Sequence, residues 1–126
     1  MEPIDVETAS DEELGCWLAE NVVNDETVQE TGGIFHLPHS DWIETFDPCR
    51  VLPHADMCLA KFWDRWGIII RRWPSGMYNG TAGQEDPKCT GYPITFRTKS
   101  RTEARCRAEL AALIALEEAR DHNGKR

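Results

Sequence analysis

The first 49 residues contain no lysine and no arginine, and the first basic side chain is Arg50. The same 49 residues hold thirteen of the 22 Asp and Glu residues. Solvated helices usually interleave both signs of charge, because opposite charges three or four residues apart stabilise them. We therefore predict that residues 1–49 are not fully neutralised by the rest of the chain and present a negative surface.

A membrane span and a secretion signal are also missing. The longest apolar run, Gly67–Ile70, is far shorter than the roughly 20 residues that cross a bilayer. Met1–Asp5 lacks the basic start and apolar centre of a signal peptide. We expect a cytoplasmic protein with no membrane partner and one domain, 1–126, with a loose acidic arm (1–9) and a frayed tail (122–126). The net charge of −8 argues against direct nucleic-acid binding, because phosphates need a basic footprint.

Patterns for catalysis, metals and cofactors are weak. Cys49, His54 and Cys58 lie close together and Cys89 offers a fourth ligand, but no paired zinc spacing appears. The same segment contains the residue types of a Cys/His/Asp site, although such sites are rarely built from one short segment. No glycine spacing fits a phosphate-binding loop. We predict no catalytic residues, no metal and no cofactor, with the cysteines as reduced, buried thiols.

Three helices are predicted. Ser10 and Glu13 form a capping-box pattern that opens a helix over about 10–23. A second, aromatic-rich helix has Pro53 in its first turn and ends at Gly67. A second capping-box pattern, Ser100–Glu103, opens the last helix, which we expect to run to about residue 121.

Strands are predicted between these helices. Residues 34–38 form a short edge strand, because Pro38 lacks a ladder donor. Residues 68–73 and 92–98 are strands by their β-branched and alternating residues. Residues 77–82 are either a weak strand or part of a long hairpin loop, and residues 83–91 are a surface loop. The fold class is α+β: an antiparallel sheet of three to four strands packed with about three helices.

Strand alternation places a basic and aromatic set on one face of this sheet. Tyr92, Ile94 and Phe96 define the core face, which leaves Arg97 and Lys99 outward. Arg71 and Trp73 join them outside if Ile68 and Ile70 point into the core. The set Arg71, Trp73, Arg97 and Lys99 is suited to stack and pair a nucleotide signal. Alternatively, the arginine stems cover apolar sheet and pair with acids of the first helix.

The last predicted helix carries a family resemblance. Its residues 103–110 resemble the closing helix of small bacteriophage ABA-sandwich proteins, whose Ala-x-Cys-Arg-Ala-x-Leu core matches Ala104, Cys106, Arg107, Ala108 and Leu110. Residues 10–23 resemble the opening helix of that family, and residues 54–66 stand where its middle helix lies. The resemblance implies an α/β sandwich and a phage origin, and it implies no particular activity.

An acidic phage protein without catalytic residues is most simply a stoichiometric binder. We therefore expect an anti-defence inhibitor of the anti-CRISPR kind, whose acids occupy a basic groove on a host effector protein. The residues expected to form its binding surface are Glu7, Asp11, Glu12, Glu13, Glu20, Asp25, Glu26 and Glu30. A solvated helix face that only keeps the protein soluble is the plainer alternative.

Overall fold

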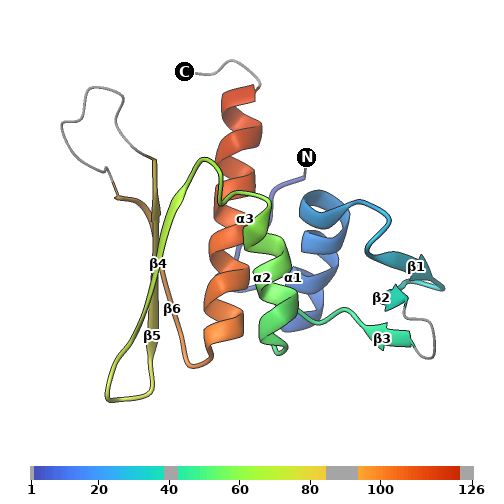
Figure 1. The fold of residues 1–126 in the computed structure, drawn as a ribbon, viewed down its shortest axis with the longest axis horizontal. Coiled ribbons are helices and arrows are strands. Elements are labelled where there is room, and N and C mark those ends of the chain that lie inside the picture. Colours follow the sequence, from blue (N-terminus) through green and yellow to red (C-terminus); the bar gives the residue numbers. More distant parts are fainter. Residues whose placement is uncertain (1, 39–42, 85–93, 123–126) are drawn as a thin grey trace.

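The computed structural model describes residues 2–38, 43–84 and 94–122, and it confirms the α+β class (Figure 1). The elements are α1 (Asp11–Leu18), the π-helical turn η1 (Ala19–Val23), β1 (Gln29–Thr31), β2 (Ile34–Pro38), β3 (Ile43–Thr45), α2 (Leu52–Ala60), β4 (Gly67–Arg72), β5 (Tyr78–Gly83), β6 (Ile94–Ser100) and α3 (Glu103–His122). None of the described helices is both long and apolar enough to span a bilayer.

The strands form two separate antiparallel sheets, β1-β2-β3 and β4-β5-β6. Figure 1 shows the helices between them: α3 lies against β4–β6, and α1 and α2 pack on the other side of α3. The small sheet β1–β3 lies at the end of the molecule away from β4–β6 (Figure 1). The larger sheet is therefore covered by a helix on one face only, among the described elements.

The predicted first helix is confirmed together with its cap. The side chain of Ser10 accepts a hydrogen bond from the Glu13 backbone N–H, and Glu13 accepts one from the Ser10 N–H. The helix widens into η1 and ends at Asn24, which adopts a left-handed conformation with φ 34°. The turn carries the chain away from the core before β1 begins.

The other two helices differ from prediction at their ends. Helix α2 has Pro53 in its first turn as expected, but it ends at Ala60, and a turn continues to Arg65. Ser100 is the last residue of β6 and does not cap α3. The hydroxyl of Thr102 accepts from the Arg105 N–H at 3.2 Å instead, so the cap lies two residues later than predicted.

Helix α3 forms the centre of the core. Leu110 and Ile114 are fully buried, as are Leu14, Leu18 and Leu59 from the other two helices. Strand β5 reaches α3 through Gly80, where an added Cβ would lie 2.6 Å from Leu110 Cδ1 and 2.9 Å from Cys106 Sγ. The sheet approaches the helix this closely because residue 80 has no side chain.

The small sheet corrects two predictions. Residues 34–38 do form a strand, but β2 is the central strand, paired with β1 and β3, and not an edge. Pro38 is tolerated because it is the last residue of β2. The polar segment 24–33, which ends in Gly-Gly, predicts a loop or short irregular segment, but its residues 29–31 form β1. The region predicted as a surface loop at 83–91 lies mostly outside the described residues, as do Tyr92 and the tail from residue 123.

Candidate functional site

The uncovered face of β4–β6 carries the basic and aromatic set predicted from strand alternation. We call this surface the open sheet face; its residues are Ile69, Arg71, Trp73, Asn79, Thr81, Arg97 and Lys99. In the sheet register, Arg71 is opposite Asn79, which is opposite Lys99; Ile69, Thr81 and Arg97 form the neighbouring row. Ile69 is 68% exposed, so this face is not buried by the described chain.

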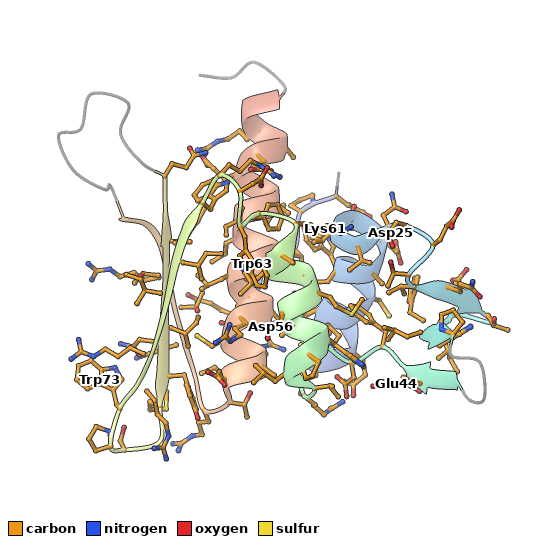
Figure 2. The ribbon with its side chains drawn as sticks, viewed as in Figure 1. Asp25, Glu44, Asp56, Lys61, Trp63 and Trp73 are labelled. Carbon is orange, nitrogen blue, oxygen red and sulfur yellow. The ribbon has the colours of Figure 1, made fainter. Side chains whose placement is uncertain are left out.

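Trp73 is fixed at one corner of the open sheet face, where Figure 2 shows it on the side away from the helices. Its backbone N–H donates to the Met77 carbonyl at 2.8 Å, which closes the β4–β5 hairpin. The Asn79 side-chain oxygen accepts from Trp73 Nε1 at 3.0 Å in the amide orientation that satisfies both amide atoms. The Arg71 guanidinium lies 4.4 Å from the centre of the indole ring. These contacts hold a cation and a 38%-exposed aromatic ring together.

The cations of this region differ from the other described cations in having no carboxylate partner. Arg50, Lys61, Arg65, Arg105, Arg107 and Arg120 each make an ion pair. Within the described ranges, five cations make neither an ion pair nor a hydrogen bond through their side chains: Arg71, Arg72, Arg97, Lys99 and Arg101. All five lie on β4, on β6 or just after β6, so the sheet has cations in excess of its own acids.

A groove of about 1260 Å³ begins on the open sheet face and brings together all four predicted ligand residues, Arg71, Trp73, Arg97 and Lys99. It continues past β6 to Leu113 of α3 and to residues 4–7. The groove therefore has a basic side formed by the sheet and an acidic side formed by Asp5 and Glu7.

Residues 4–7 belong to the predicted loose arm, and the structure places this arm against α3. Arg105 donates to the carbonyls of Val6 and Ala9 at 2.9 and 2.8 Å. Trp17 Nε1 donates to the Glu2 carbonyl at 2.7 Å. Sequence reasoning missed Asp5 as a groove residue, and it placed Glu7 on the acidic partner surface instead. The sequence gives no signal for this placement, because the contacts that hold the arm come from Trp17 and from Arg105, which lies nearly a hundred residues later.

The predicted acidic surface is partly neutralised by the same chain. Asp11 pairs with Arg50 and Arg105, Glu12 pairs with Arg50, and Asp25 pairs with Lys61 at 2.6 Å. Figure 2 shows Asp25 and Lys61 facing each other. The Lys61 hydrogen bond lowers the pKa of Asp25 to about 2. The Glu13 carboxylate accepts a hydrogen bond from the Ser10 N–H in the cap of α1. These acids therefore have structural partners within the molecule.

The other four acids of the predicted surface make no ion pair within the described part of the chain. They are the exposed residues Glu7, Glu20, Glu26 and Glu30. Glu20 and Glu30 lie near Cys16. Burial raises the pKa of that thiol, and the carboxylates of Glu20, Glu12 and Glu30 raise it further. An acidic cluster thus exists around η1 and β1, at the end of the molecule away from β4–β6 (Figure 1).

The cysteines and histidines of the central segment pack into the core. Burial raises the pKa of both Cys49 and Cys58 to about 12, so these thiols are poor nucleophiles. His54 Nδ1 accepts from the Asp47 N–H at 2.9 Å, and its Nε2 lies 2.7 Å from Glu44. Across the described ranges, no three His, Cys, Asp or Glu side chains are grouped to hold a metal ion; Cys89 lies outside these ranges.

Comparisons with known proteins add no assignment: no family model, curated protein or solved structure matches this chain significantly. The geometry of the groove and the distribution of charge are therefore the basis of the functional argument.

Proposed function

We propose that this chain is a ligand-binding module that takes a nucleotide on the open sheet face. The observation that carries the proposal is the meeting, in one groove, of an exposed tryptophan with cations that have no carboxylate partner in the described chain. A nucleotide supplies what these groups lack: a planar ring for Trp73 and phosphate oxygens for Arg97 and Lys99.

The energetics favour a ligand of this kind. Stacking of a base on an aromatic side chain contributes about 1–3 kcal/mol. An arginine or lysine that is already unpaired binds phosphate without first losing an internal ion pair, and charge-assisted hydrogen bonds are roughly twice as strong as neutral ones. The net charge of −8 opposes long-range attraction of a polyanion, so a short ligand suits this chain better than a long nucleic acid.

Calorimetry tests this proposal directly. A panel of mononucleotides, linear dinucleotides and cyclic nucleotides is titrated into the wild-type chain and into Arg97→Glu. Arg101→Glu is the matched control, because Arg101 is also exposed and unpaired in the described chain but does not line the groove. We expect binding to the wild type and the control, with a loss of about tenfold or more in Arg97→Glu. No heat with any nucleotide, or equal losses in both variants, contradicts the proposal.

The acidic cluster supports a second candidate, the anti-defence inhibitor. Glu20, Glu26 and Glu30 are exposed, free of ion pairs in the described chain and gathered at one end of the molecule. They are suited to a basic groove on an effector protein, where complementary charge speeds encounter and sets specificity. Co-elution with an effector complex that weakens with salt and is lost on Glu20→Lys and Glu26→Lys supports it. Co-elution that ignores both salt and these reversals contradicts this mechanism.

A further inference from the structure

The groove is longer than the open sheet face and changes its chemistry along its length. Trp73 and Arg71 form the β4 end. The backbone of β6, which carries Arg97 and Lys99, lies about 10 Å from that of β4, because neighbouring strands are roughly 4.8 Å apart and β5 lies between them. Beyond β6 the groove reaches residues 4–7 and Leu113. The order is therefore aromatic, then cationic, then mixed apolar and acidic.

We propose that the groove takes a dinucleotide, with one base on Trp73, the linking phosphates on Arg97 and Lys99, and the second base against the N-terminal arm. This inference rests on the proposed function and names the class of ligand. The groove volume of about 1260 Å³ supports it. That volume is above the roughly 300–1,000 Å³ of typical small-molecule sites, so a mononucleotide leaves part of the groove empty.

The arm end suits a base and not a phosphate. Ile4, Val6 and Leu113 supply apolar surface there, while Asp5 and Glu7 supply carboxylates. The two carboxylates repel phosphate, which leaves the cationic middle of the groove as the place for the linking phosphates.

The carboxylates also select among bases. An ionised carboxylate only accepts hydrogen bonds, so it favours an edge that carries an amino group. Adenine, guanine and cytosine offer such a group, whereas uracil offers a carbonyl oxygen at the corresponding position. The Glu7 side chain makes no hydrogen bond within the described chain and is exposed, so it is available to a ligand. We therefore expect the second base to be one that carries an amino group.

The N-terminal arm is held firmly enough to discriminate between bases. Arg105 holds the carbonyls on either side of Glu7, at Val6 and Ala9, and Val6 itself is buried. The Asp5 carboxylate accepts from the Glu7 N–H at 3.0 Å, which fixes the turn between the two acids. A base that enters the groove thus meets carboxylates on a backbone that is already ordered, which reduces the entropy cost of binding.

The test compares six ligands by calorimetry: the diadenosine, diguanosine and diuridine dinucleotides and the three corresponding mononucleotides. We expect the amino-bearing dinucleotides to bind about tenfold tighter than the diuridine dinucleotide. They should also bind about tenfold tighter than any mononucleotide, since one stacked base is lost in the shorter ligand. Equal affinities for diuridine and the others, or for mononucleotide and dinucleotide, overturn this inference and leave the proposed function standing.

Two matched variant pairs locate the two bases. Glu7→Gln should reduce the preference over diuridine to about threefold or less, because an amide also donates to a carbonyl. Glu26→Gln, at another exposed acid that lies outside the groove, should leave the preference unchanged. Trp73→Ala should weaken dinucleotide binding about tenfold, whereas Trp63→Ala, at a 58% exposed residue outside the groove, should not. An unchanged preference in Glu7→Gln overturns the inference, and no binding of any nucleotide by the wild type overturns both proposals.

Discussion

The helical side of the molecule and the open sheet face use their cations in opposite ways. On the helical side, Arg105 joins α1, the arm and α3, and Arg107 joins α3 to Asp56 of α2, which Figure 2 shows between the two helices. On the sheet, Arg97 and Lys99 touch no acid within the described residues. The cations on the helices therefore hold elements together, whereas the cations on the sheet remain available to a ligand.

Arg105 gives the largest expected difference between the two regions. Its side chain is 13% exposed and it pairs with Asp11 at 2.7 Å and with Glu109 at 2.8 Å. Arg105→Met removes these pairs and leaves the 12%-exposed Glu109 carboxylate without its cation. We expect a loss of roughly 3–5 kcal/mol in the free energy of unfolding, measured by urea denaturation.

Arg97→Met is the matched change on the sheet. It removes no ion pair, so its free energy of unfolding should stay within about 0.5 kcal/mol of the wild type. Similar losses in Arg105→Met and Arg97→Met would show that the two regions do not differ in the way described.

Gly80 lies on the helix-covered face of the sheet and tests how tightly that face packs against α3. Gly80→Ala places a Cβ 2.6 Å from Leu110 Cδ1, so the helix-covered face must shift. We expect a loss of about 1–3 kcal/mol by overpacking, measured as a lowered urea midpoint. Gly67→Ala is the control, because the nearest atom to its added Cβ is the Gly83 carbonyl oxygen at an ordinary 3.6 Å. A neutral Gly80→Ala would mean that β5 and α3 are less tightly packed than described.

Lys61 should give the smallest effect, because its pair with Asp25 is exposed. The pKa of Asp25 in the folded state is about 2, below its ordinary value of 3.8, because Lys61 hydrogen-bonds the carboxylate and Thr27 donates to it. A lowered folded pKa adds stability above pH 3.8, and this stability is lost as the pH falls through 2. Lys61→Met should therefore cost only about 0.2–1 kcal/mol at pH 7.

The measurement is the free energy of unfolding between pH 5 and pH 2. We expect the wild type to lose more stability than Lys61→Met over that range, and the two curves to converge at the acid end. Parallel curves would indicate that Lys61 does not lower the pKa of Asp25. Lys99→Met, which removes an unpaired cation, serves as the control and should follow the wild type.

Much of the open sheet face was predictable because strands alternate with a strict period of two. Once Ile68 and Ile70 are assigned to the core, Arg71 and Trp73 must point the other way, and the structure confirms this. The capping box at Ser10 was predictable for a similar reason, since its partners are three residues apart. Local periodicity was sufficient for both.

The small sheet and the arm could not be predicted, because their partners are remote or unmarked. Strand β1 consists of the polar residues 29–31, which show no alternation. The arm is held by Arg105, and the same residue neutralises Asp11, 94 positions earlier. Contacts at such a separation leave no spacing signal in one sequence. The acidic side of the groove and the partial neutralisation of residues 1–49 are therefore visible only in the structure.

The indole N–H signals of the five tryptophans test the central claim most directly. In a two-dimensional ¹H–¹⁵N NMR titration with a nucleotide, we expect the Trp73 signal, assigned by its loss in Trp73→Phe, to shift. The signals of Trp17 and Trp66, whose Nε1 groups donate to Glu2 and Glu118 on the helical side, should stay in place. A Trp73 signal that does not move with any nucleotide, or moves no more than those of Trp17 and Trp66, would contradict the account.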